Sequence, residues 1–273
     1  MFPGAVTDRE AAAYVIVGAP LDVSTTFQPG TRFGPDRVRL FARSFEDYDH
    51  HTGGHFSELG VHDDGDLHAW DDAEEYLTFL GGKLSDIRNE GALPILIGGE
   101  HTVSRAGVRA CEPDVFVALD AHLDLRAEYD GNPSSHATVT HHALETADEA
   151  IILGARTGDE TEWERASAED VTVVEPNELS DWLASVRDQS LAIDGSVYLS
   201  VDIDAADPSV APGTGTMEPF GLGAREMQAV VRTLAPACVG FDVVEVNDRD
   251  DGQAATLAGK LLRSFVYQHA ADT

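Results

Sequence analysis

Three short segments of the sequence carry carboxylate and imidazole side chains at spacings that suit metal binding. The first ends in Gly-Gly-Glu-His, the second is Asp-Ala-His-Leu-Asp and the third is Asp-Ile-Asp. Their candidate ligands are His101, Asp120, His122, Asp124, Asp202 and Asp204. Side chains alternate between two faces in an extended backbone, so Asp120, His122 and Asp124 would point the same way, and so would Asp202 and Asp204. We therefore predict that the six side chains surround one metal centre.

Four converging carboxylates cannot all ionise unaided, because like charges raise one another's pKa. Two divalent cations would cancel the formal charge of these four Asp side chains. If two Asp residues bridge the metals, each metal has four protein ligands and space remains for a shared water. Oxygen-rich ligation with one imidazole per metal favours a harder ion such as Mn²⁺, with Co²⁺, Ni²⁺ or Zn²⁺ as replacements in vitro. A metal pair lowers the pKa of a shared water, which predicts hydrolysis by a bridging hydroxide.

Each of the three segments directly follows a short apolar run, at 93–97, 115–119 and 197–201. Such runs are typical of buried strands. In an open α/β sheet the carboxyl ends of the strands border the crevice in which ligands bind. Strands at these positions would therefore place all three segments at that edge.

Further apolar runs alternate with stretches of helical spacing along the chain. We expect strands at 14–18, 151–153, 171–174 and 239–244, and helices at 71–89, 102–110, 135–146, 160–168, 179–188, 224–233 and 254–269. This alternation indicates an α/β fold with a mainly parallel sheet covered on both faces. No low-complexity linker or internal repeat divides the chain, so we expect a single domain, residues 1–273.

The charge balance excludes several classes of partner. The chain has 49 Asp and Glu against 18 Lys and Arg, a formal net charge of -31. This charge would repel nucleic acid and an anionic membrane surface. We interpret it as a halophilic surface suited to a salty cytosol, with an acidic mesophilic enzyme as the alternative. Two cysteines, no secretory leader and no apolar run long enough to span a bilayer predict a cytoplasmic protein.

The motifs resemble the ureohydrolase family, which includes agmatinase, arginase, guanidinobutyrase and formimidoylglutamase. Residues 27–35 (FQPGTRFGP) are similar to the family's N-terminal loop, and 98–102 (GGEHT) and 120–124 (DAHLD) are similar to its first two metal motifs. Residues 200–222 are similar to its long signature around the last two metal ligands. Residues 242–247 (DVVEVN) are similar to its substrate-side segment. The resemblance implies two Mn²⁺ per subunit, a three-layer αβα fold, a small guanidino substrate and a homotrimer or homohexamer.

The resemblance also implies roles for single residues. One metal would be held by His101, Asp120, Asp124 and Asp202, and the other by Asp120, His122, Asp202 and Asp204. His136 matches the proton shuttle to the leaving amine, and Glu245 matches the glutamate that orients the guanidinium group. The chain departs from the family at Ala137, where Gly is common, and at Asn247-Asp248, where Pro is common. These departures leave the pocket shape and the substrate open.

The reaction implied is hydrolysis of a linear guanidino compound to urea and an amine, most simply agmatine to putrescine. The loop at 125–134 contains Glu128 and Asp130, which would suit a tail that is only a cation. Guanidinobutyrase, arginase and aminopropylagmatine ureohydrolase are alternatives within the family. A deacetylase with one catalytic metal, or an inactive family member serving as an assembly subunit, is an alternative of another kind.

Several residues also have a purely structural interpretation. Without the resemblance, His136 would be a histidine at a helix N-terminus and Glu245 a charge at a strand end. Glu100 is expected to form a structural hydrogen bond. The remaining histidines are expected in solvated loops (His50, His51, His55, His62 and His68), on a helix face (His141 and His142) or near the C-terminus (His269).

Overall fold

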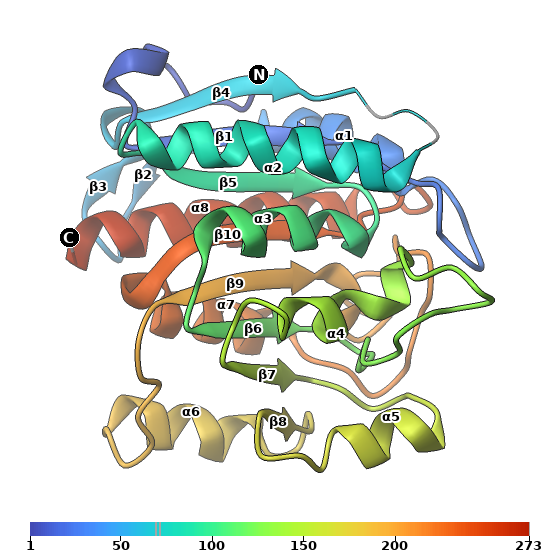
Figure 1. Cartoon of the computed structure of the whole chain (residues 1–273). Coiled ribbons are helices and arrows are strands. Elements are labelled where there is room, and N and C mark those ends of the chain that lie inside the picture. Colours follow the sequence, from blue (N-terminus) through green and yellow to red (C-terminus); the bar gives the residue numbers. More distant parts are fainter. Residues whose placement is uncertain (69, 71, 273) are drawn as a thin grey trace.

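A parallel β-sheet runs through the centre of the protein (Figure 1). The computed structural model describes residues 1–68, 70 and 72–272. Within this part, eight strands pair in the order β4-β1-β5-β10-β9-β6-β7-β8, and every pair is parallel. They are β1 (Tyr14–Ala19), β4 (Val61–Asp66), β5 (Leu93–Gly98), β6 (Val115–Leu119), β7 (Glu149–Leu153), β8 (Val171–Val174), β9 (Val197–Asp202) and β10 (Cys238–Val244).

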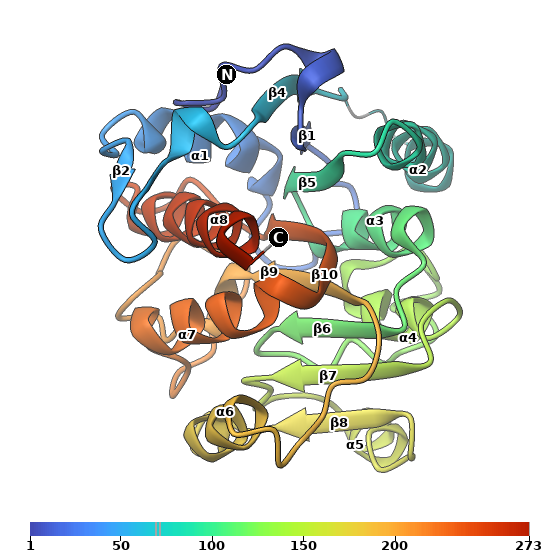
Figure 2. The ribbon, with the colours of Figure 1, turned by 90° about the vertical axis from the view of Figure 1, so that its left-hand side faces the viewer.

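Helices cover both faces of this sheet, as Figure 2 shows from the ends of the strands. One layer contains α1 (Gly34–Ala42), α6 (Leu179–Arg187), α7 (Ala224–Leu234) and α8 (Gln253–Asp272). The other contains α2 (Ala73–Asn89), α3 (Ser104–Cys111), α4 (Val139–Ala143) and α5 (Glu160–Arg165). The expected three-layer αβα arrangement is confirmed. In the described part of the chain, no helix combines the length and the apolar character needed to cross a bilayer.

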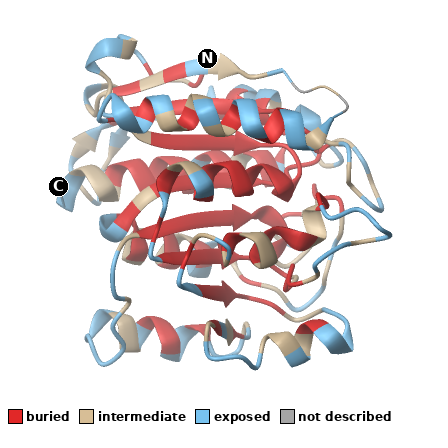
Figure 3. Cartoon of the chain, in the orientation of Figure 1, coloured by how far each residue is buried: buried red, intermediate tan, exposed pale blue. Residues whose placement is uncertain are grey.

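The strands are apolar along their length because helices pack on both of their faces. In β1, Tyr14 and Ile16 belong to one hydrophobic core, whereas Val15 and Val17 belong to another. This is the period-two alternation of an extended chain, here with both directions buried. Figure 3 shows the buried residues concentrated in the sheet and along the inner sides of the helices.

One helix and three strands were not predicted from the sequence: α1, strand β4, and the two strands of a small hairpin, β2 (Tyr48–Asp49) and β3 (Gly54–His55). Strand β4 has the polar sequence VHDDGD and lies at the edge of the sheet, paired only with β1 among the described strands. His62 lies on this strand, half-buried, with its Nδ1 2.8 Å from the carbonyl oxygen of Thr7. The expectation of a solvated loop is therefore wrong for His62. Asp71, the expected start of a helix, lies outside the described residues, and α2 begins at Ala73.

Candidate metal centre

Four neighbouring strands in the middle of the sheet carry the predicted site residues. The order β5-β10-β9-β6 brings together the strand ends that lead to His101, Glu245, Asp202 and Asp120, respectively. Because these strands are parallel, their carboxyl ends meet at one edge of the sheet, on the right in Figure 1.

His101 lies among three carboxylates. Its Nδ1 is 3.1 Å from Asp120 Oδ2, 3.0 Å from Asp124 Oδ2 and 3.6 Å from Asp202 Oδ2. The imidazole is 1% exposed, so these contacts form in an environment that water barely reaches. The structure thus joins residues that follow three different strands.

His122 lies beside the remaining carboxylate. Its Nδ1 is 3.1 Å from Asp204 Oδ2 and 3.4 Å from Asp120 Oδ1. The two oxygens of Asp120 therefore face different histidines. Two overlapping triads result, each with its ligand atoms within 4.8 Å of one another: His101, Asp120 and Asp202, and Asp120, His122 and Asp204. Asp120 belongs to both triads, as expected of a carboxylate that bridges two cations.

A hydrogen-bonded chain orients the ring of His101. Ser200 gives its single hydroxyl hydrogen to Asp242 Oδ1 at 2.6 Å, and Tyr198 donates to Asp242 Oδ2 at 2.8 Å. His101 Nε2 lies 3.0 Å from Ser200 Oγ and must be the donor in that contact. A neutral His101 ring then presents a lone pair on Nδ1 to the carboxylates. Because the lone pair and the carboxylate oxygens repel one another, a cation is needed between them. A metal-ligating histidine typically donates its other ring N–H in this way.

The electrostatics of the cluster also fit divalent cations. Burial, together with the charge of Asp120, raises the pKa of Asp124 to about 7. Burial, with the charges of Asp204 and Asp120, raises the pKa of Asp202 well above its usual range. Although burial opposes the shift, the charge of Asp204 and hydrogen bonds to two carboxylates raise the pKa of His122 to about 12. The bare cluster therefore holds extra protons, whose charge two metal ions would replace.

The backbone of the centre includes two residues in the left-handed region, Asp124 (φ 51°) and Glu245 (φ 61°). Asp adopts this conformation more readily than Glu does. Glu245 is held by two hydrogen bonds: its N–H donates to Gly99 O, and its Oε1 accepts from His101 N, each at 2.8 Å. A Cβ atom on Gly99 would lie 2.0 Å from Leu21 O, so the close approach of these two backbone segments requires glycine at position 99.

His136 lies next to Glu245, with 3.8 Å between His136 Nδ1 and Glu245 Oε1. Its Nε2 is 3.2 Å from Thr26 Oγ1, and its backbone N–H donates to Ser24 Oγ at 2.9 Å. Burial, with the charges of the two site histidines, lowers the pKa of His136 to about 4. The imidazole is therefore placed against the centre in its neutral form.

Glu100 helps to hold Ser24, and through it His136, in place. It is fully buried and accepts hydrogen bonds from Ser24 N and Ser24 Oγ, both at 2.7 Å, and from Thr102 Oγ1 at 2.9 Å. The expected structural role of Glu100 is confirmed. Ser24 thereby connects Glu100 to His136, a connection across more than a hundred residues that sequence analysis missed.

A pocket of about 340 Å³ opens beside the centre. His122, Asp124 and His136 line it together with Arg126 and Asp159. Glu128 and Asp130, which were expected to contact a substrate tail, line a neighbouring hollow of about 380 Å³ instead. The two hollows share several lining residues, namely Arg126, Tyr129, Asp159 and Glu162.

Other residues around the centre were also missed. Asp242 is a lone carboxylate inside an otherwise apolar strand, which is a signal that sequence analysis could have used. Asn247, one of the departures from the family pattern, is buried and donates from Nδ2 to Gln28 O at 2.7 Å. This hydrogen bond fastens the N-terminal loop over the carboxyl ends of the strands, and the spacing of Gln28 and Asn247 along the chain gives no hint of it.

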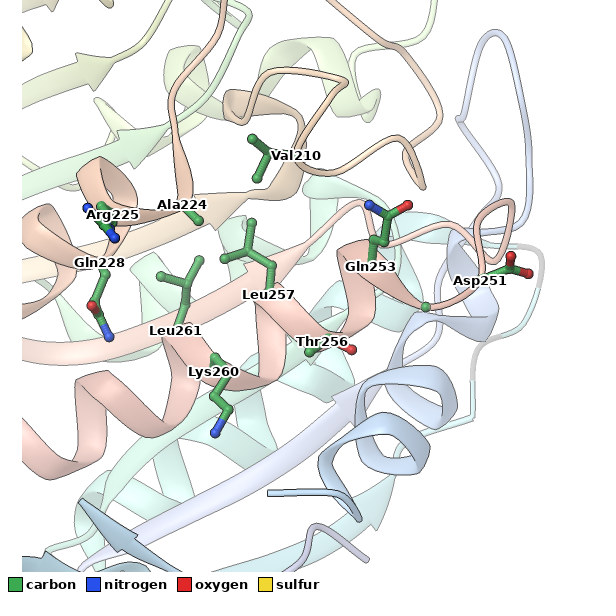
Figure 4. Close-up of a pocket in the computed structure, with 11 residues that line it drawn as sticks. Val210, Ala224, Arg225, Gln228, Asp251, Gln253, Thr256, Leu257, Lys260 and Leu261 are labelled. Atoms are coloured by element: carbon green, nitrogen blue, oxygen red, sulfur yellow. The ribbon is translucent and has the colours of Figure 1, made fainter. Parts of the chain in front are cut away.

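A hollow of about 550 Å³ lies elsewhere, beside the first turns of α7 and α8 (Figure 4). Val210, Leu257 and Leu261 give it an apolar lining, and Lys260 lies at its margin. None of the metal-binding groupings found among the described residues includes a residue of this hollow. This hollow is therefore separate from the candidate metal centre.

Comparison with known proteins agrees with this geometry. Residues 12–267 match the model of the arginase family. An agmatinase of Pyrococcus horikoshii is 34% identical, with 93% of this chain and 91% of that protein covered. An N(1)-aminopropylagmatine ureohydrolase of Thermococcus kodakarensis is also 34% identical, over 94% and 91%. The crystal structure of the agmatine ureohydrolase of Thermoplasma volcanium superposes with a TM-score of 0.91 at 32% identity, over 99% and 94% of the two chains.

Proposed function

Because the chain belongs to the arginase family of ureohydrolases, which hydrolyse C–N bonds of linear amidines, we propose that it hydrolyses agmatine to putrescine and urea. The observation that carries the choice of substrate is the charge of the pocket. Two carboxylates, Asp159 and Glu162, face a single guanidinium, Arg126, in the pocket beside the metal centre. This excess of negative charge favours a substrate that is cationic at both ends.

In the proposed enzyme, one metal is held by His101, Asp120, Asp124 and Asp202, and the other by Asp120, His122, Asp202 and Asp204. Two divalent cations held there, which we propose to be Mn²⁺, would lower the pKa of a water molecule and stabilise the negative charge on its oxygen, so that it can attack the guanidinium carbon. The hydrogen bonds of Ser200 and Asp242 support this assignment for His101, because they leave Nδ1 of its neutral ring free to bind a metal.

Glu245 orients the guanidinium group of the substrate. Its Oε1 is already engaged by the backbone N–H of His101, which leaves Oε2 to accept from the substrate. His136, 3.8 Å from Glu245, is neutral and so can take up the proton that the attacking water loses and pass it to the departing amine. Thr26, in contact with His136 Nε2, positions the imidazole ring for that transfer.

Asp159 receives the ammonium end of the substrate. Glu162 is occupied, since it accepts from Leu125 N, Arg126 Nε and Asp159 N at 2.8–3.2 Å. Asp159 Oδ1 caps α5, since it accepts from Thr161 Oγ1 at 2.7 Å and from Glu162 N at 2.9 Å. Asp159 Oδ2 lies 3.3 Å from Arg126 Nη2, and the side chain is 46% exposed, so this second oxygen is open to the ammonium end of a substrate.

A second candidate substrate is aminopropylagmatine, which has a longer cationic tail. It is favoured by the hollow that adjoins the pocket, because Glu128 and Asp130 lie along its wall. A tail that passes Asp159 would reach these carboxylates, whereas agmatine would end before them.

The test is urea release from agmatine, N(1)-aminopropylagmatine, 4-guanidinobutyrate and arginine by enzyme loaded with Mn²⁺ in high KCl. We expect the largest kcat/KM for agmatine. A larger value for arginine or 4-guanidinobutyrate would refute a pocket selective for a cationic tail. Urea release from none of the four would instead favour the inactive assembly subunit.

Two variants sharpen this test. Asp159→Asn is expected to raise KM for agmatine about tenfold, equivalent to about 1.4 kcal/mol of lost binding, and to leave KM for 4-guanidinobutyrate unchanged or lower. Glu128→Gln is the matched control and should alter KM only for aminopropylagmatine. Equal effects of the two substitutions on agmatine would contradict the assignment of Asp159.

The metal identity and the assembly are further proposals. Two Mn²⁺ per chain, measured by elemental analysis of protein purified from its natural cells, and a trimer or hexamer in light scattering are the expected results. Family membership favours the binuclear centre over the deacetylase alternative, which keeps one catalytic metal.

A further inference from the structure

A second grouping of metal-binding side chains lies outside the candidate centre, on and just after helix α4. His141, His142 and Glu145 each offer a ligand atom, and these atoms lie within 4.8 Å of one another. Glu145 follows His141 by four residues and His142 by three, so its direction on the helix surface falls between theirs. The two imidazole rings meet edge to face, with their centroids 5.2 Å apart.

The hydrogen bonds of His142 show which of its ring nitrogens is available. Its Nε2 lies 2.9 Å from the carbonyl oxygen of Pro133. A carbonyl oxygen can only accept, so Nε2 carries the hydrogen. In the neutral ring, Nδ1 then presents a lone pair to Glu145 Oε1, only 3.1 Å away. Two acceptors at that distance require a cation or a proton between them.

This is the same arrangement that orients His101 in the centre, where the other ring N–H is also fixed by an acceptor. An ion at ~2.1 Å from a histidine nitrogen and a carboxylate oxygen, the usual zinc distances, can span a separation of 3.1 Å. The cation that now faces Glu145 is Arg109, at 3.7 Å, and its side chain is 45% exposed. Arg109 is therefore too distant and too solvated to neutralise the carboxylate fully.

We propose that His141, His142 and Glu145 bind one additional divalent ion of the zinc class, separate from the two ions of the catalytic centre. Its donors are two imidazoles and one carboxylate, whereas the centre offers each ion one imidazole among several carboxylates. Imidazole-rich sites prefer Zn²⁺, Cu²⁺ or Ni²⁺, and carboxylate-rich sites suit Mn²⁺. The two sites therefore select different metals, and water completes the coordination at the surface site.

Occupancy of this site fastens the loop that carries His136. With Nδ1 on the metal, His142 keeps its Nε2–H on Pro133, three residues before His136. The backbone N–H of His141 donates to Asp124 O at 3.0 Å, so the same turn also contacts the second metal motif. The inference concerns metal binding and loop order, and it stands independently of the proposed substrate.

The first experiment measures zinc uptake by protein already loaded with Mn²⁺. Equilibrium dialysis should show one Zn²⁺ bound per chain with both Mn²⁺ retained, and anomalous diffraction at the zinc edge should place it at His142 and Glu145. His142→Ala, and separately Glu145→Gln, should reduce its affinity at least tenfold. His50→Ala, which alters an exposed histidine elsewhere, should not. Zinc found only in place of manganese, or equal uptake by all variants, would overturn the proposal.

The second experiment measures hydrogen exchange of the amides in residues 131–138 of the Mn²⁺-loaded protein. Zinc should slow their exchange severalfold in the wild type and leave it unchanged in His142→Ala. Slowing of equal size in that variant would disprove the link between the surface site and the loop. His141→Ala provides a second test of the link, because it removes a different ligand and leaves the contact between His142 and Pro133 intact.

Discussion

Two groups of carboxylates in this sheet differ in what balances their charge. At the edge strand β4, Asp63 is gripped by Arg39, whose Nε and Nη2 each donate to one carboxylate oxygen at 2.8 Å. Arg39 also donates to Asp66 at 2.5 Å, and the backbone N–H of Phe2 donates to Asp63. In the middle of the sheet, the four Asp residues of the metal centre form ion pairs only with histidines within the described part of the chain.

The pKa values differ accordingly. Burial raises the pKa of Asp63, but the hydrogen bonds and charge of Arg39 outweigh it and lower the pKa below its usual value. At the centre, burial and neighbouring carboxylates raise the pKa of both Asp124 and Asp202. Asp63 is thus part of a structural ion pair, whereas several buried carboxylates that converge around two histidines, with no arginine among their ion pairs, mark a candidate metal site.

The largest expected effect concerns the four Asp residues of the metal centre. Asp202→Asn should lower kcat/KM for agmatine by at least ~10⁴-fold, because ligands of one centre act as a unit. In EDTA at neutral pH the same variant should melt at a higher temperature than metal-free wild type, since Asn removes the cost of protonating a buried carboxylate beside Asp204 and Asp120. Urea release and thermal unfolding measure these two effects. A metal-free variant less stable than the wild type would break the comparison.

Asp63, which pairs with Arg39, should respond to substitution in the opposite way. Asp63→Asn leaves Arg39 buried without its full partner, so the free energy of unfolding should fall by about 3–5 kcal/mol. Below its melting temperature the variant should still bind two metals and release urea. Unfolding in urea provides the measurement, and the double variant Asp63→Asn/Arg39→Met should recover most of the loss. No recovery would mean that the charge of Arg39 is not the cause.

The pH dependence of stability should also have opposite signs in the two groups. The pKa of Asp124 is raised from 3.8 to about 7, so its contribution in metal-free protein is present at low pH and is lost as pH rises through this interval. The stability of wild type relative to Asp124→Asn should fall by up to about 1.4 kcal/mol per pH unit. The pKa of Asp63 is lowered, so its contribution should be lost on acidification below its unfolded value. Slopes of the same sign would refute the distinction.

The smallest expected effect is that of salt, which should change the stability contributed by exposed charges more than that contributed by buried ones. With a net charge of -31, the melting temperature of the wild type should rise with KCl concentration, because salt screens repulsion between exposed carboxylates. The loss caused by Asp63→Asn should change by less than ~0.5 kcal/mol over the same range, because a buried pair is poorly screened. A melting temperature independent of KCl would reject the halophilic interpretation.

The central part of the fold was predictable because its strands are continuous apolar runs. The runs before the three motifs appear in the structure as β5, β6 and β9, within one residue of their expected ends. Parallel pairing then brings their carboxyl ends together, as strand assignment predicts. The period-two alternation does not account for the rest, because the backbone after these strands is not extended: Asp124 has a φ of 51°, and His101 and Asp204 lie in short 3-10 helices.

The edge of the fold was not predictable on the same grounds. Strand β4 has one free side and uses Asp63 to bind Arg39, so it lacks the apolar pattern by which strands are recognised. The contacts of Ser24 and Thr26 with His136 depend on how a glycine-rich loop folds back over the sheet. Such long-range loop contacts leave no periodic signal in a single sequence.

The left-handed conformations of Asp124 and Glu245 matter for anyone who evolves this protein in the laboratory. Strained backbone of this kind costs on the order of 1–3 kcal/mol per residue, and glycine in its place would relieve the strain. A library screened only for heat resistance should therefore enrich glycine at position 245 and erase turnover with it. Holding these two codons constant would prevent such a search from gaining thermal stability at the cost of enzymatic activity.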